Sequence, residues 1–319
     1  MAKTYAIAPY SIAIVGIGKI TEDQHLPCIA KNPRFKLTGL VSQRGVARDG
    51  VPSFKTLREL LKSDTPVDAV AICTPPNPRH AIAVEAMDAG KHVLLEKPTT
   101  ATTLETADLV AHAAKTKRVA YATWHSQHNA AVDEAKRLLV GQRLKRLHVE
   151  WKEDVKRWHP GQEWIWAPGG FGVFDPTINA LSILTKILPA PLFVTAAELI
   201  TPVNRETPIA GKVSFRSPAA AAGAPLTADV DWRQTGPQSW NIDIETESGL
   251  KLALREGGSK LSVDGKETVA QPMEEYERIY EHFAELLDKG ESDMHYAPLQ
   301  LIADAFFVGR RVATDAFHW

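Results

Sequence analysis

The sequence predicts two domains: an α/β domain built on a doubly wound parallel sheet, followed by an α+β domain with a mostly antiparallel open sheet. In the first 124 residues, short apolar strand patterns alternate with helical patterns. Two of these strands, 68–73 and 93–95, are nearly continuous apolar runs, which is typical of a parallel sheet covered by helices on both faces. In the second half, several strand patterns follow one another directly, which favours antiparallel pairing.

The length of 319 residues suits two domains, which we expect at 1–126 and 127–319. The expected elements of the first domain are strands 11–16, 36–41, 68–73, 91–95 and 119–123, with helices between them such as 78–89 and 102–116. Those of the second are helices near 130–140 and 176–188, strands 145–154, 192–200, 212–216, 226–233, 239–246 and 250–255, and closing helices 273–289 and 297–313.

Composition argues against several functional classes. The net charge of −1 gives no basis for nucleic-acid binding, and no apolar run approaches the ~20 residues of a membrane helix. The apolar run after Ser11 is only a strand long, so we do not read it as a signal peptide. Cys28 and Cys73 are expected as reduced, buried thiols, which fits a cytoplasmic protein. Histidines and cysteines are scattered, so no metal site is expected.

A glycine turn follows the first strand and precedes a helical pattern. Gly16 permits the tight turn, and Gly18 lets the backbone approach a pyrophosphate at the helix N-terminus, where Lys19 and Ile20 follow. The third fingerprint position is Thr21 instead of Gly or Ala, which predicts looser or differently angled helix packing. Glycines also simply end strands, but the position of this turn favours a dinucleotide site.

Two further segments bear on the cofactor. Ser42 and Arg44 follow the second strand, where an NAD-specific enzyme usually has an acidic residue; they favour NADP, with NAD also accepted. The alternative for Arg44 is a solvated loop cation. Thr74, Pro75 and Asn77 follow the 68–73 strand and fit the nicotinamide side of the crevice, although a purely structural turn explains them equally well.

The strand 91–95 ends in Glu96, Lys97 and Pro98, which places a lysine where chemistry beside a nucleotide is expected. With the two turns above and an aspartate opening a later helix, Asp175, this motif resembles the glucose–fructose oxidoreductase/inositol dehydrogenase (Gfo/Idh/MocA) family over nearly the whole chain. The resemblance implies an N-terminal Rossmann domain, a hydride-transfer activity, and a place for Glu96 and Lys97 at the cofactor.

Family members commonly carry a histidine four residues after that aspartate, whereas this chain has Asn179. This departure, with the segments 151–166 and 169–176, resembles the aldose 1-dehydrogenase branch that acts on L-arabinose and D-galactose. The implied reaction oxidises the anomeric C1 hydroxyl to an aldonolactone. Because these sugars share their configuration from C2 to C4, one pocket can take both.

Three residues are assigned to catalysis. Lys97 can stabilise the developing alkoxide, and Asp175 can accept the proton directly or through Lys97. Asp175 precedes Pro176 and is expected to be a helix N-cap, with Asn179 about one turn further on. The alternative is that Asp175 only caps its helix.

Four residues are assigned to the sugar: Glu153, Trp158, His159 and His125. Tryptophan suits stacking on the apolar face of a pyranose, although core packing explains any one tryptophan as well. His125 can equally be a satisfied loop histidine. An uncovered second-domain sheet would also favour a homodimer.

Two other functions stay open. One is a different hydride transfer within the same family, such as a polyol dehydrogenase or a sugar–sugar oxidoreductase, which would yield a ketose or alditol instead of a lactone. The other is a non-catalytic sensor of sugar or dinucleotide, which would have little reason to keep Lys97, Asp175 and Asn179 together.

Overall fold

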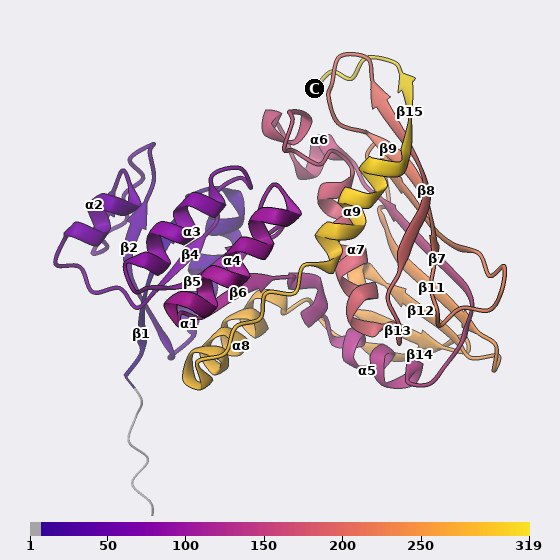
Figure 1. The fold of residues 1–319 in the computed structure, drawn as a ribbon, viewed down its shortest axis with the longest axis horizontal. Helices are drawn as coiled ribbons and strands as arrows, with labels where there is room; N and C mark the ends of the chain where they lie inside the picture. The colour runs from indigo at the N-terminus through magenta and orange to yellow at the C-terminus, as the bar shows by residue number, and fades with distance from the viewer. Residues whose placement is uncertain (1–7) are drawn as a thin grey trace, which may run out of the picture. The chain divides into compact units, whose positions relative to one another are not determined.

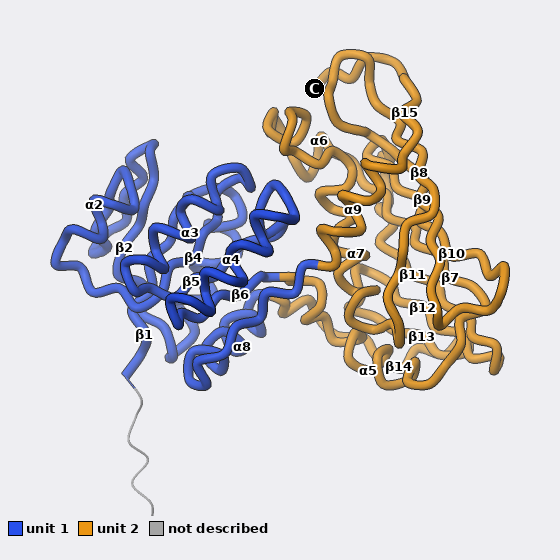
Figure 2. Tube along the Cα trace, in the orientation of Figure 1, with its two compact units in different colours: residues 1–123, 276–296 blue, residues 124–275, 297–319 orange. Residues whose placement is uncertain are grey.

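The computed structural model describes residues 8–319, which form two compact units (Figure 2). Unit 1 comprises residues up to 123 together with 276–296, and unit 2 comprises 124–275 and 297–319. The sequence predicts one boundary, at 126/127, and the structure differs because the chain returns to unit 1 for residues 276–296. The reason is the apolar face of α8 (Glu275–Lys289), whose buried Tyr280 and Phe283 belong to the unit 1 core.

The sheet of unit 1 is parallel throughout, with the order β3-β2-β1-β4-β5-β6, which confirms the doubly wound prediction. The strand order reverses at β1, which lies between β2 and β4. Its strands are β1 (Tyr10–Val15), β2 (Phe35–Val41), β3 (Ser53–Phe54), β4 (Ala69–Ile72), β5 (His92–Glu96) and β6 (Ala120–Thr123). The two-residue β3 is too short to leave a sequence signal and was not predicted.

Helices pack against this sheet (Figure 1). Ile12 and Ile14 of β1 pack in one core cluster with residues of α1 and α8, including Ile29 and Phe283. Apart from α8, the helices of unit 1 lie between successive strands in the sequence. They are the π-helical turn η1 (Thr21–His25), α1 (Leu26–Lys31), α2 (Leu57–Lys62), α3 (Arg79–Asp88) and α4 (Thr103–Thr116).

Unit 2 is built on a nine-stranded sheet with the order β14-β13-β12-β11-β7-β10-β9-β8-β15. Two neighbour pairs, β10 with β7 and β15 with β8, are parallel and the others antiparallel, which confirms the mostly antiparallel prediction. The strands are β7 (Leu144–Lys152), β8 (Phe193–Pro202), β9 (Ala210–Arg216), β10 (Leu226–Asp231), β11 (Ser239–Thr246), β12 (Lys251–Arg255), β13 (Lys260–Val263), β14 (Lys266–Ala270) and β15 (Gly309–Thr314).

One face of this sheet carries the longer helices α5 (Ala130–Leu139), α7 (Phe174–Ile187) and α9 (Ala297–Val308), as Figure 1 shows. Short helical turns complete the unit: η2 (His125–His128), α6 (Val155–Trp158), η3 (Glu163–Trp166) and η4 (Glu256–Gly258). Along β7, Leu147, Val149 and Trp151 are buried, whereas the residues between them are only half-buried. The helices therefore cover the face to which the apolar residues point.

The predicted closing helix 297–313 is wrong in its last third. The helix α9 ends at Val308, and Gly309–Thr314 form β15, which pairs in parallel with β8. A Cβ on Gly309 would lie 2.4 Å from the carbonyl oxygen of Ala305, so the chain turns sharply there. Pairing with the edge of the sheet overrides the helical pattern, which the local sequence does not reveal.

Within residues 8–319, no helix has the length and apolar character needed to cross a membrane. The same residues hold no group of three or more His, Cys, Asp or Glu arranged to bind a metal ion. Cys28 and Cys73 are buried free thiols.

Candidate functional site

The glycine turn of unit 1 has the geometry that its sequence predicts. Gly16 has φ +93°, and a Cβ there would lie 2.7 Å from the backbone nitrogen of Thr74, so only glycine fits. A Cβ on Gly18 would meet nothing within 4 Å, which leaves the backbone open to a ligand. Helical structure begins directly afterwards, at Lys19.

The structure explains why the third fingerprint position is Thr21 instead of Gly or Ala. The Thr21 hydroxyl donates to the Gly16 carbonyl over 2.8 Å, and the residue is fully buried. The differently packed helix that the sequence predicts takes the form of a π-helical turn, Thr21–His25. The threonine therefore ties the helix start to the turn by a hydrogen bond instead of by close backbone packing.

Several predicted cofactor residues gather at this edge of the sheet. The Arg44 guanidinium donates to the carbonyl of Ile17 inside the glycine turn, and the Arg44 backbone N–H donates to the Ser42 hydroxyl over 3.3 Å. The Thr74 hydroxyl is buried without a hydrogen-bond partner among the described residues, which leaves it available to a ligand. An open backbone, a nearby cation and an unpartnered hydroxyl fit a dinucleotide.

The other residues predicted at the cofactor lie on the surface around this turn. Lys19 forms an ion pair with Asp23 on the next helical turn. The side chain of Ile20 is 36% exposed, and Pro75 and Asn77 are exposed in the turn after β4. Their side chains are therefore open to a ligand that approaches from solvent.

A buried arginine that no sequence pattern predicts fixes the segment that bears Lys97. Arg79, the first residue of α3, is 4% exposed. Its guanidinium donates to the carbonyls of Thr74 (2.7 Å), Glu96 and Pro98. One side chain thereby joins the ends of β4 and β5 through main-chain oxygens, on both sides of Lys97. Nothing in the local sequence distinguishes this arginine from a solvated one.

Glu96 was predicted at the cofactor, but its side chain points into unit 1 and is 3% exposed. One carboxylate oxygen accepts from the Tyr276 hydroxyl over 2.7 Å and lies 3.0 Å from His25 Nε2. The other accepts the backbone N–H of Lys97 over 2.9 Å. Tyr280 completes the group, with its hydroxyl 2.7 Å from His25 Nδ1. Glu96 therefore fixes the backbone of Lys97 through a hydrogen bond from the buried side of the strand end.

The charge on His25 follows from these neighbours. Burial alone lowers the pKa of His25, but Cys73, Tyr280 and Glu96 around it raise that pKa well above its usual value. A protonated imidazole beside a carboxylate forms a paired, hydrogen-bonded buried charge. No local sequence pattern predicts this group, because His25 and Tyr280 lie 255 residues apart.

In unit 2, three of the predicted residues form a cluster. Glu153 is 5% exposed, and its carboxylate accepts the indole N–H of Trp232 (3.1 Å) and of Trp240 (2.9 Å). His159 Nε2 lies 3.6 Å from Glu153 Oε1 and 3.9 Å from Asp175 Oδ2. We call Glu153, His159 and Asp175 the acidic cluster. The buried Nδ1 of His159 has no hydrogen-bond partner among the described residues.

Asp175 is not the helix cap that the sequence predicts. The helix α7 begins at Phe174 after Val173, and the Asp175 backbone N–H already donates to the Gly172 carbonyl over 2.9 Å. Asp175 is therefore the second residue of the helix, and its carboxylate Oδ2 lies 3.9 Å from His159 Nε2. Asn179 follows one turn later on the same helix and is half-buried.

The glycines of the loop before α7 are required by close backbone approach. A Cβ on Gly170 would lie 2.3 Å from the Trp164 carbonyl oxygen, and one on Gly172 would lie 2.2 Å from that of Pro208. Gly172 also has φ +52°. The loop is thereby folded tightly between η3 and α7, which sets the start of α7 and the position of Asp175.

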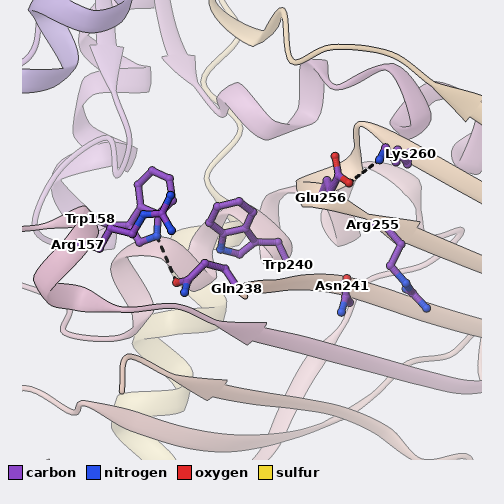
Figure 3. A pocket seen from close by; sticks show the side chains of 8 residues that line it. All are labelled: Arg157, Trp158, Gln238, Trp240, Asn241, Arg255, Glu256 and Lys260. Carbon is purple, nitrogen blue, oxygen red and sulfur yellow. Dashed lines mark hydrogen bonds and ion pairs between the residues drawn. The ribbon is translucent and has the colours of Figure 1, made fainter. Parts of the chain in front are cut away.

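A pocket of about 590 Å³ adjoins this cluster through Trp240 (Figure 3). Trp158 packs edge-on to Trp240 at 5.3 Å between ring centroids, and its indole N–H donates to Gln238. Aromatic faces beside planar polar side chains suit a ligand with both apolar faces and hydroxyl groups. Its lining residues are Arg157, Trp158, Gln238, Trp240, Asn241, Arg255, Glu256 and Lys260.

His125, predicted to bind sugar, has a structural partner. Its Nδ1 lies 2.9 Å from Glu275, which also accepts from Asn129 over 2.7 Å. Burial alone would raise the pKa of Glu275, but His125 and the hydrogen bonds from its neighbours lower it. His125 therefore anchors the start of α8, and a contact with substrate stays a prediction.

Comparison with known proteins identifies the family. Residues 10–124 match the family model described as "Oxidoreductase family, NAD-binding Rossmann fold" for Gfo/Idh/MocA proteins. Over 97% of the chain and 99% of its relative, the sequence is 44% identical to galactose 1-dehydrogenase of Pseudomonas fluorescens. The chain belongs to the Gfo/Idh/MocA family.

Solved structures extend the likeness. D-galactose-1-dehydrogenase from Rhizobium etli superposes with a TM-score of 0.92 at 50% identity, covering 98% of this chain and 99% of that one. A 3-ketoreductase from Actinomadura kijaniata, solved with NADP and TDP-benzene, has a TM-score of 0.83 at 18% identity, covering 96% and 99%. The second likeness concerns the fold alone. This Gfo/Idh/MocA protein is an oxidoreductase with an NAD-binding Rossmann domain.

Proposed function

We propose that the protein is an NAD(P)-dependent aldose 1-dehydrogenase that oxidises the C1 hydroxyl of sugars of the D-galactose and L-arabinose type to the aldonolactone. The observation that carries the proposal is the acidic cluster beside a tryptophan-lined pocket, in a chain 44% identical to a galactose 1-dehydrogenase. Buried carboxylates with an imidazole suit hydroxyl recognition and proton transfer.

Oxidation of a cyclic hemiacetal removes a hydride from C1 and a proton from the C1 hydroxyl. The bound cofactor supplies the hydride acceptor. We assign proton acceptance to Asp175, directly or through Lys97, because Asp175 is a buried carboxylate that lies beside His159. Lys97 stabilises the negative charge that develops on the C1 oxygen. Its backbone is fixed by Glu96 and by the two carbonyls that Arg79 holds.

The remaining sugar hydroxyls are assigned to Glu153, His159 and Asn179. Each Glu153 oxygen accepts one indole N–H and retains a further acceptor site for a hydroxyl. The unpartnered Nδ1 of His159 and the amide of Asn179 add donor and acceptor capacity. Trp158 offers a ring face to the sugar, and His125 is retained as a further contact.

For the cofactor, we propose NADP, with NAD also accepted. The carboxylate-free end of β2 and the Arg44 guanidinium over the glycine turn support binding of a 2′-phosphate, with Ser42 beside it. The turn from Gly16 to Ile20 is assigned to the pyrophosphate, and Thr74, Pro75 and Asn77 to the nicotinamide side.

The test mixes the purified protein with NADP or NAD and a panel of pentoses and hexoses, and follows absorbance of the reduced nicotinamide. We expect reduction with D-galactose and L-arabinose and a lactone as the product. A ketose or alditol would favour a different hydride transfer of the family. Nucleotide binding without reduction by any sugar would favour a sensor.

We also propose a cytoplasmic homodimer that pairs through the unit 2 sheet face opposite α5, α7 and α9. Residues on that face, such as Glu150, Asp229 and Asn241, are polar and half-buried within one protomer. Light scattering coupled to size exclusion gives the test, and a mass of 35.0 kDa, that of one chain, would contradict it.

A further inference from the structure

Residues 315–319 follow β15 without regular structure but are fixed in place in unit 2. The backbone N–H of Phe317 donates to the side-chain oxygen of Asn204 over 2.9 Å. The Asn204 amide donates back to the Phe317 carbonyl over 2.9 Å. This reciprocal pair holds Phe317 at one position relative to the turn after β8.

From there, aromatic rings lead to η3. The Phe317 ring lies 4.8 Å from that of Trp166 and 5.3 Å from that of Trp319. The Trp319 indole N–H donates to Glu163, the first residue of η3, and Arg205 pairs with Glu163 at 2.6 Å. Arg205 also lies over both the Trp166 and Phe317 rings. Both ends of η3 are therefore held by residues 317–319 and Arg205.

The next contact reaches the acidic cluster. Trp166 meets Trp232 edge-on at 5.3 Å, and Trp232 donates to Glu153 and lies 5.2 Å from the His159 ring. Trp166 is 2% exposed, and its indole N–H has no hydrogen-bond partner among the described residues. No hydrogen bond holds the indole N–H, so the rings and the Arg205 guanidinium packed around Trp166 decide its position.

We propose that Phe317 and Trp319 are positioning residues for the sugar site, which act through Trp166 and Trp232 on Glu153 and His159. The inference rests on the proposed function, because it takes these two as sugar ligands. Densely packed rings have few alternative arrangements, so removal of one lets its neighbours shift. A small displacement of Glu153 and His159 weakens their hydrogen bonds to the sugar.

The test compares Phe317→Ala with Phe317→Tyr, which keeps the ring, and with Phe307→Ala as the matched control. Phe307 is an apolar residue of α9, ten positions earlier in the chain, and is 92% exposed. For each protein we would measure KM and kcat for D-galactose, Kd for NADP, and Tm. Phe317→Ala should raise KM about five- to twentyfold, the range that losing one or two hydrogen bonds gives. The Kd for NADP and the kcat should stay within about twofold, as in Phe317→Tyr and Phe307→Ala.

An unchanged KM in Phe317→Ala would overturn the inference, as would equal weakening of sugar and NADP, which marks general destabilisation. If Phe317→Ala does not fold, Trp319→Leu decides by the same KM criterion. The parent protein separates this inference from the proposed function. A parent that oxidises no aldose contradicts the proposed function, whereas an active parent with an insensitive Phe317→Ala contradicts only the role of residues 317–319.

Discussion

Unit 1 and unit 2 fix their candidate functional groups in different ways. In unit 1, the glycine turn and Lys97 follow directly after strands that main-chain hydrogen bonds hold in register, and the side chains of Arg79 and Glu96 then bind that main chain. In unit 2, the acidic cluster is placed by side chains, since Trp232 and Trp240 reach Glu153 from 79 and 87 residues away. Groups fixed by the main chain leave local motifs, whereas groups fixed by packing do not.

The largest effect is expected at Asp175, which tests whether the acidic cluster of unit 2 is functional. Asp175→Asn should lower kcat about 10²–10⁴-fold, the range for loss of a general base. Asn179→Ala, one turn along α7, should cost less because it removes only a positioning contact. Steady-state kinetics of both variants, with folding checked by Tm, provide the measurement. If Asn179→Ala were the more damaging change, Asp175 would lose its role as base.

Next in size is Lys97, which tests the unit 1 side of the comparison. Lys97→Met should lower kcat about 10²–10³-fold, as for loss of one preorganised electrostatic group. Because Glu96 and Arg79 hold the backbone there, the fold and the NADP Kd should be retained. The exposed Lys62→Met serves as control. Activity within threefold of the parent would remove Lys97 from the mechanism.

A smaller effect is expected on cofactor preference. It tests whether Ser42 and Arg44, which follow β2, contact the adenosine half of the cofactor. Ser42→Asp adds a carboxylate that repels a 2′-phosphate and can bind the ribose hydroxyls of NAD. Arg44→Ala removes a cation that lies over the glycine turn. Each change should shift the NADP/NAD ratio of kcat/KM toward NAD by about ten- to a hundredfold. An unchanged ratio would place both residues outside the adenosine pocket.

The smallest effect concerns stability. It tests the buried group around His25 and Glu96, which shows that unit 1 also contains side chains fixed by long-range packing. Protonated His25 beside Glu96 has a raised pKa, so its stabilising contribution is fully present below its usual value. The contribution is lost as pH rises through the higher folded pKa. Denaturant midpoints measured from pH 6 upward should therefore fall for the parent, and His25→Asn should flatten this fall. Parallel curves for the two proteins would show that His25 is neutral in the fold.

The candidate site was predictable to the extent that it is local in the sequence. Gly16 and Gly18 were identified from spacing, and their geometry agrees: one lies against Thr74 and the other is open. The family resemblance implies that Glu96 lies at the cofactor, yet its side chain turns inward to Tyr276 of α8. The alternation of side chains along a strand predicts the sheet face to which a residue points. It does not predict which side chain of a later helix packs against that face.

By itself, the sequence determined the parallel sheet of unit 1, the glycine turn and the lysine at the end of β5, since each depends on residues close in the chain. Only the tertiary structure decided that residues 276–296 return to unit 1, that Gly309–Thr314 form a strand, and that two indoles hold Glu153. The physical reason is that these outcomes depend on which apolar faces and polar groups meet after folding. Long-range packing and hydrogen-bond satisfaction set those meetings and leave no periodic signal in the local sequence.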